Sequence, residues 1–283
     1  MASAPQLLPG VSLVTAPGGG LAVRTAEGEF LRVDTARTAP ERLIGALTGQ
    51  PEGTAADPEL AALLGAFEDA GYAGTDAAAR PGRLTGRTVL LLGDPALTAP
   101  LGRLVRAEGG TARPAGTEEI ARLPDGTHRP GTTAVVWCLN SPVPEGLWDG
   151  ADRLPGHRTA WLRCHREGAQ VWLEPLADRP GDVTSGHVRL RRLAATPAHR
   201  ELAAYWAGHR TPDTGPPVTE TAAALIAALL TADLLAWAAG APGPGPLPVR
   251  RRLRRLDLRD LAVTAHPVLP VPEVAPLPDR TGR

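Results

Sequence analysis

The sequence of 283 residues predicts an α+β unit at the front and an α/β domain behind it. In the first eighty residues, short apolar runs separated by glycine turns precede two helical patterns, which is the order of an antiparallel sheet followed by helices. Further along, longer uninterrupted apolar runs alternate with helical segments, as in strands buried on both faces of a parallel sheet. We therefore place the two domains at residues 1–80 and 81–283.

The first unit begins with three short strands. Apolar and β-branched residues gather at 11–15, 21–25 and 30–34, and the glycine-bearing segments 17–20 and 27–28 between them are typical of hairpin turns. Successive hairpins predict an antiparallel sheet whose third strand has an exposed edge.

Two short helices are expected after the strands. Thr38 is a suitable N-cap for the first, with Pro40 in its opening turn. Asp57-Pro58 opens the second, which carries an apolar stripe of Leu60, Leu63, Leu64 and Phe67. Three strands followed by short helices predict a small winged-helix-like module.

The second domain follows a linker rich in Ala, Arg, Pro and Gly at residues 76–86. Apolar runs at 88–92 and 133–137 predict buried parallel strands, with helices at 97–108 and 117–123 between them. The rest of the domain is expected to hold a hairpin at 160–173, helices at 197–208 and 218–239, a strand within 250–265 and a Pro-rich tail from 266.

The turn after the first of these strands lacks phosphate-binding chemistry. A nucleotide-binding α/β domain places several glycines there, whereas this chain has Gly93 followed by Asp94 and Pro95. All thirty Lys and Arg residues are arginine, so the sequence has no lysine that could serve in a P-loop or form a Schiff base. We therefore expect no bound cofactor and no catalytic residue.

Composition excludes several further functions. The formal net charge is zero, which gives no reason to expect nucleic acid or an anionic membrane as a partner. The N-terminus lacks a signal-peptide pattern, so we expect a cytoplasmic protein. Residues 221–239 are apolar but contain Asp233, which favours a buried helix over a membrane span.

A few residues invite chemical interpretations that we weigh against structural ones. Cys138 and Cys164 cannot form a disulfide framework or a four-thiolate zinc site, and they are expected to be packed core thiols. The arginine run at 250–255 predicts an exposed strand face or a surface for an acidic partner. Trp161 and Trp172 are expected to face each other across the hairpin.

Three stretches of the chain resemble the E1-like (Ocin-ThiF-like) partner proteins of azole-forming YcaO cyclodehydratases. They are the opening Leu-Leu-Pro-Gly-Val at 7–11 with its three strands, the hairpin and Pro-Gly turn at 159–185, and Ala-His-Pro-Val-Leu-Pro-Val-Pro at 265–272. Where such proteins carry zinc cysteines, this chain has Ser185, Gly186, His187 and Val188, and near its end Leu269 and Pro272. The resemblance therefore implies a degenerate E1/Rossmann-like domain without a metal site.

The same resemblance implies a function. E1-like relatives bind the leader of a ribosomally synthesised precursor peptide and present it to a YcaO-type cyclodehydratase, which uses ATP to form azolines, as in thiopeptide biosynthesis. On that basis we expect a non-catalytic scaffold whose partners are a leader peptide and a cyclodehydratase. A homodimer stays open, and so do two other functions: a divergent nucleotide-binding enzyme that uses Gly93, and a module that bridges two biosynthetic enzymes.

Strand addition is the expected mode of leader binding, because an extended peptide can pair with an open strand edge. The expected leader-binding residues lie on the third strand and on the facing helix: Phe30, Leu31, Arg32, Val33, Leu60, Leu63, Leu64 and Phe67. The alternative for Leu60, Leu64 and Phe67 is that they only form the core of the small unit.

Overall fold

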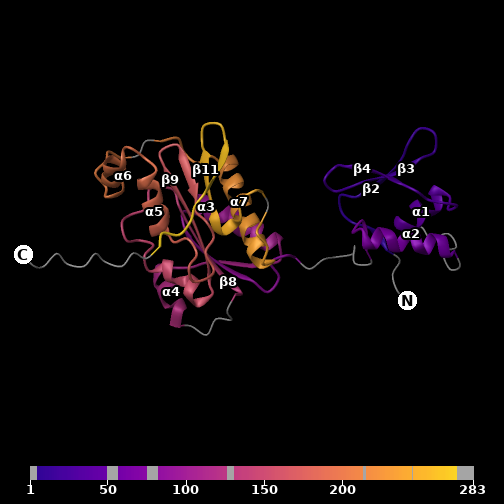
Figure 1. Cartoon of the computed structure of the whole chain (residues 1–283). Helices are drawn as coiled ribbons and strands as arrows, with labels where there is room; N and C mark the ends of the chain where they lie inside the picture. The colour runs from indigo at the N-terminus through magenta and orange to yellow at the C-terminus, as the bar shows by residue number, and fades with distance from the viewer. Residues whose placement is uncertain are drawn as a thin grey trace, which may run out of the picture. The chain divides into compact units, whose positions relative to one another are not determined.

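The computed structural model describes residues 5–49, 57–74, 82–125, 131–212, 215–243 and 245–272. The chain divides into two compact units, Met1–Pro81 and Gly82–Arg283 (Figure 1).

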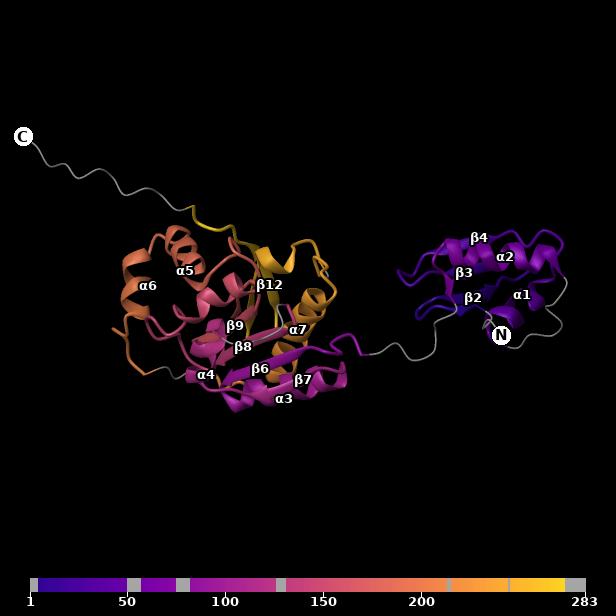
Figure 2. The ribbon, with the colours of Figure 1, turned by 90° about the horizontal axis from the view of Figure 1, so that it is seen from below.

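The first unit contains a three-stranded antiparallel sheet in the order β2-β3-β4. Both helices lie on one face of this sheet, with α2 on the side of β4 (Figures 1 and 2). A second, two-stranded pair, β1 with β5, completes the unit. It was not predicted, because two-residue strands show no periodicity. The elements are β1 (Gln6–Leu7), β2 (Ser12–Thr15), β3 (Leu21–Arg24), β4 (Phe30–Val33), α1 (Pro40–Leu47), α2 (Pro58–Asp69) and β5 (Ala73–Gly74).

The core of this unit is apolar. Leu21 and Val23 of β3 are buried against the helices, where they meet Leu43 of α1 and Phe67 of α2. The only buried polar side chains among the described residues of the unit are two threonines. Hydrophobic burial therefore holds the small unit together, and its ion pairs, such as Arg42 with Asp57, lie outside the core.

The second unit is built on a seven-stranded mixed sheet in the order β12-β11-β10-β9-β8-β6-β7. The pairs from β7 to β9 are parallel and those from β9 to β12 are antiparallel. The α/β layering predicted for this domain is thereby confirmed. The strands are β6 (Thr88–Gly93), β7 (Thr111–Pro114), β8 (Thr133–Leu139), β9 (Ala160–Glu167), β10 (Gln170–Leu173), β11 (Arg252–Asp257) and β12 (Val263–Pro267).

Helices cover both faces of the large sheet. One face carries α3 and α7 over the larger apolar core, and the other carries α4, the first two 3-10 turns, α5 and α6 (Figures 1 and 2). The helices are α3 (Pro95–Ala107), α4 (Thr117–Arg122), α5 (Ser185–Ala194), α6 (His199–Trp206) and α7 (Glu220–Ala238), with 3-10 turns at Leu123–Asp125, Ala151–His157 and Val249–Arg251.

Helix α5 occupies the segment where the resemblance placed a lost zinc site. Thr184 is its N-cap and accepts a hydrogen bond from the His187 backbone N–H at 3.2 Å, while His187 Nδ1 accepts one from the Thr184 N–H at the same distance. These reciprocal bonds form a capping box with histidine in the usual place of glutamate or glutamine. The histidine explains why the sequence did not predict this helix.

Candidate functional site

The strand β4 offers an open backbone edge. It pairs with β3 on one side, and no other strand borders it in the described part of the chain. The Thr25 N–H donates to the Glu29 carbonyl at 2.8 Å, which fixes the hydrogen-bonding phase of the hairpin. Because bonded and non-bonded pairs alternate along an antiparallel ladder, Leu31 and Val33 bond to β3, while the N–H and C=O groups of Phe30 and Arg32 face outwards.

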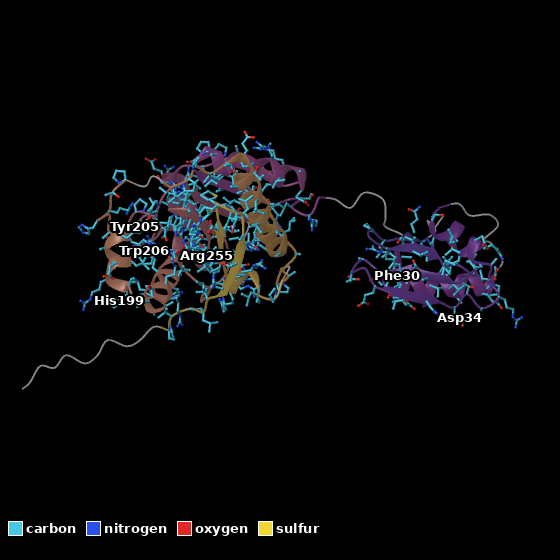
Figure 3. The ribbon with its side chains drawn as sticks, turned by 90° about the horizontal axis from the view of Figure 1, so that it is seen from above. Phe30, Asp34, His199, Tyr205, Trp206 and Arg255 are labelled. Atoms are coloured by element: carbon cyan, nitrogen blue, oxygen red, sulfur yellow. The ribbon has the colours of Figure 1, made fainter. Side chains whose placement is uncertain are left out.

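The side chains of β4 divide between two faces. Leu31 and Val33 lie opposite the buried residues Val23 and Leu21, so they share the helix side of the sheet. Phe30 and Arg32 lie on the outer face. Phe30 is 62% exposed and Leu31 is 41% exposed, which is unusual for large apolar side chains on adjacent residues. Figure 3 marks Phe30 and Asp34, which bracket this strand.

The facing helix α2 divides the remaining predicted residues into two groups. Leu63 and Leu64 are half-buried and stay within reach of a ligand at the edge of the unit. Leu60 and Phe67 are only 2% and 6% exposed. Their assignment to a binding surface is corrected, because side chains so completely packed stabilise the small core.

The turn after β6 has a glycine for a reason unrelated to phosphate. Gly93 has a φ of +100°, and a Cβ there would lie 1.8 Å from the Cys138 carbonyl oxygen, so only glycine fits between β6 and β8. Asp94 caps α3 by accepting a hydrogen bond from the Ala96 N–H at 2.8 Å. A carboxylate thus occupies the helix N-terminus that would otherwise attract an anion.

Ionisable side chains gather beneath α5, on the β9–β10 hairpin. Arg163 is fully buried and donates from Nε to Glu174 Oε2 at 2.7 Å. Glu167 accepts hydrogen bonds from both terminal nitrogens of Arg192, at 3.0 and 2.6 Å, and from Trp206 Nε1 at 2.7 Å. Each carboxylate therefore has a charged partner.

The pKa values of the two glutamates move in opposite directions. Burial raises the pKa of Glu174 above its usual value, although Arg163 and His165 oppose the shift. Burial would also raise the pKa of Glu167, but hydrogen bonds from His165 and Arg192 outweigh it and hold that pKa well below its usual range. Divergent carboxyl pKa values occur in acid–base sites and in structural ion pairs alike.

A small cavity adjoins this cluster. Its lining includes Trp148, His165, Glu174 and Ser185, and its volume is about 40 Å³. Trp148 Nε1 and His165 Nδ1 are buried without hydrogen-bond partners. A space of this size suits a few ordered waters that would satisfy these nitrogen atoms. The carboxylates of the cluster are paired with arginine inside the unit.

The arginine run proves to be structural as well, which corrects its assignment to an exposed face. Arg252 and Arg254 are buried and donate to Asp233 of α7, with three N–O distances between 2.6 and 2.9 Å. Arg250 forms a two-bond ion pair with Asp178, at 2.6 and 2.8 Å. Of the five arginines at 250–255, only Arg255, the last, is exposed.

Helix α7 is long and apolar enough to cross a membrane by length and composition, and in the described residues it is the one helix of that kind. More than half of its apolar window is buried inside the unit, against α3 and the sheet. Its buried Asp233 is bound to two arginines. These contacts are those of a core helix.

The two cysteines and the tryptophans of the β9–β10 hairpin are packing residues. Cys138 and Cys164 lie opposite each other on β8 and β9, and both are fully buried, as the sequence predicted. Trp172 lies opposite His165, so the predicted pairing with Trp161 is wrong. Trp161 packs edge to face with Trp137 and Trp148 instead.

Among the described residues, no three His, Cys, Asp or Glu side chains form a group that could hold a metal ion.

Comparison with known proteins identifies the fold. No family model and no curated protein matches the sequence. Solved structures do match: a heterocyclase in complex with substrate and cofactor (14% identity, TM-score 0.65, 94% of this chain) and the heterocyclase TruD (13% identity, TM-score 0.63, 94%). This chain spans only 38% and 41% of those two chains.

A third similar structure is E. coli MccB with ATP. The identity is 11%, the TM-score is 0.55, and the match covers 95% of this chain and 97% of MccB. At identities this low the similarity establishes a shared fold. That fold is the one found in heterocyclases and in MccB, in agreement with the coarse part of the resemblance seen in the sequence.

Proposed function

We propose that this protein is a non-catalytic scaffold that binds the leader of a ribosomally synthesised precursor peptide and presents it to a YcaO-type cyclodehydratase for azoline formation. The observation that carries the proposal is the open β4 edge, where outward backbone groups adjoin two exposed apolar side chains. A winged-helix-like unit of three strands and two helices would hold the peptide as a fourth strand. The similarity to heterocyclases supports this biosynthetic setting.

The contacts available to the peptide follow from the geometry of the edge. The N–H and C=O groups of Phe30 and Arg32 would form main-chain hydrogen bonds and set the register. Alternate peptide side chains would then pack on the helix side, against Leu31, Val33 and the half-buried Leu63 and Leu64. Arg32 is exposed at the rim, where it can attract a leader carboxylate.

The larger unit supports a role without chemistry of its own. Its β6–α3 turn is capped by Asp94, and its buried carboxylates are paired with arginine. We infer that this domain serves as the body that carries the peptide-binding unit. Calorimetry with ATP tests this inference directly, and heat of binding in the micromolar range would favour the nucleotide-binding enzyme instead.

Proline substitution on β4 provides the sharpest test of strand addition. Arg32→Pro removes an outward N–H while leaving the hydrogen bonds to β3 in place, because Arg32 belongs to a non-bonded pair. We expect it to weaken binding of a fluorescein-labelled candidate leader peptide by about tenfold or more in anisotropy titrations.

Arg32→Ala is the matched control, since it removes the same side chain but keeps the N–H. It should retain most of the affinity, and circular dichroism should show both variants folded. Leu31→Asp should weaken binding, whereas Val14→Asp, at a comparably exposed apolar residue on the opposite edge strand, should not. Equal affinity of Arg32→Pro and Arg32→Ala would refute strand addition at β4.

A further inference from the structure

A groove on the second unit lies between α5 and the end of the large sheet. Its volume is about 570 Å³, and residues of α5, α6, β10, β11 and β12 line it. The floor is formed by Trp172, Leu253 and Val268, which belong to a small apolar cluster. This groove adjoins the 40 Å³ cavity beneath α5, since Val188 and Arg192 line both, and it lies on a different unit from the β4 edge.

The walls of the groove are basic. Arg191, Arg192, Arg255 and His266 line it, and no acidic side chain does so among the described residues. Arg192 is neutralised by Glu167, but within the described ranges Arg191 donates only to the backbone carbonyls of Leu269 and Pro270. Arg255 is exposed, and in the described residues its guanidinium has no carboxylate partner. The groove thus has an excess of positive charge in a chain whose net charge is zero.

Two other features favour a peptide as the occupant. Trp172 Nε1 is a buried donor without a partner in the groove floor, and Arg192 stacks over its ring at 4.0 Å. Beside it, β12 is the last strand of the sheet, exposed along its whole length, so its outer backbone groups can pair with an added strand. Val263 and Leu269, at either end of this strand, are 40% and 61% exposed.

We propose that the α5–β12 groove docks an extended, acidic peptide segment of a partner protein. Carboxylates of the segment bind the Arg255 and Arg191 guanidinium groups, which suit carboxylates because their N–H donors form a planar fork. A further acceptor on the segment receives the Trp172 N–H, and its apolar residues cover Val263 and Leu269. Labels in Figure 3 locate Arg255 on this face of the unit, which also carries Trp206.

The experiment uses the full chain and a defined probe, a fluorescein-labelled decapeptide of alternating glutamate and leucine. Anisotropy should show saturable binding that weakens as the salt concentration rises. The same peptide with glutamine for glutamate should not bind. Arg255→Glu and Arg191→Glu should each weaken binding about tenfold or more, because a favourable charge becomes a repulsive one. Arg103→Glu, on exposed α3 at the opposite face, should change it less than about twofold.

Three results would overturn the proposal: equal binding of the glutamine peptide, unchanged affinity of a folded Arg255→Glu variant, or binding of labelled poly(U) that the acidic peptide does not displace. The last result would assign the groove to RNA. Leader binding at β4 serves as an independent readout. Arg255→Glu should leave it intact, and Arg32→Pro should leave acidic-peptide binding intact, so failure at one site is distinguishable from failure at the other.

Discussion

The two units of this chain differ in whether they bury charged side chains and in whether they expose apolar ones. The first buries no charged side chain among its described residues and leaves Phe30 and Leu31 exposed on an open strand. The second buries Arg163, Glu174 and Asp233 in ion pairs. The density of ionisable residues therefore does not mark the candidate binding edge. Charges are concentrated where they hold strands and helices together, and the candidate binding edge is marked by uncovered apolar side chains.

Removal of a buried charge in the second unit is expected to cause the largest loss of stability. Asp233→Asn removes the carboxylate that pairs with the buried Arg252 and Arg254, and we expect it to lower the free energy of unfolding by about 4 kcal/mol in urea titrations. Asp260→Asn, at an exposed residue of the same region, is the control and should cost less than about 0.5 kcal/mol. A stable Asp233→Asn protein would contradict a structural role for the buried pairs.

A smaller loss is expected at the β6–α3 turn. Gly93→Ala places a Cβ against the Cys138 carbonyl at a positive φ, so the backbone must shift, at a cost of about 3 kcal/mol in thermal or urea unfolding. Gly131→Ala is matched, because Gly131 also has a positive φ (+77°) but nothing lies within 4 Å of its Cβ position. It should lose only about 1 kcal/mol. Equal losses would mean that the contact with β8 is unimportant.

The smallest of the three expected losses of stability, at Glu167, depends on pH. The pKa of Glu167 lies below its ordinary 4.5, so its stabilising contribution is complete above about pH 4.5 and is lost as the pH falls toward the folded pKa. Glu167→Gln should lower stability by about 2 kcal/mol at pH 7, where Arg192 loses its partner.

The same substitution should flatten the decline of stability between about pH 4.5 and pH 3. Urea titrations over pH 3–7 measure both effects. Glu118→Gln breaks only an exposed pair with Arg122 and should change neither. A Glu167→Gln protein with the wild-type acid profile would show that another group controls acid unfolding.

Local patterns predicted much of the fold. Glycine turns and alternating apolar residues placed β2, β3 and β4, the proline-led start at Pro58 marked α2, and the helical pattern at 97–108 marked α3, which begins two residues earlier at Pro95. Such signals are readable because turn conformation and side-chain periodicity depend on neighbours in the chain. Helix α5 and the two-residue strands escaped prediction, because a histidine capping box and a pair of residues are weak local signals.

The sequence by itself determined the order of the two units, the single-glycine turn at Gly93 and the alternation of faces along β4. Only the tertiary structure decided which side chains are available. It buried Leu60 and Phe67 in the small core, paired Asp233 with Arg252 and Arg254, and left Arg255 exposed beside an open groove. The physical reason is the distance along the chain over which each effect acts. Dihedral preferences act over a few neighbouring residues, whereas burial and ion pairing depend on segments that meet only after folding.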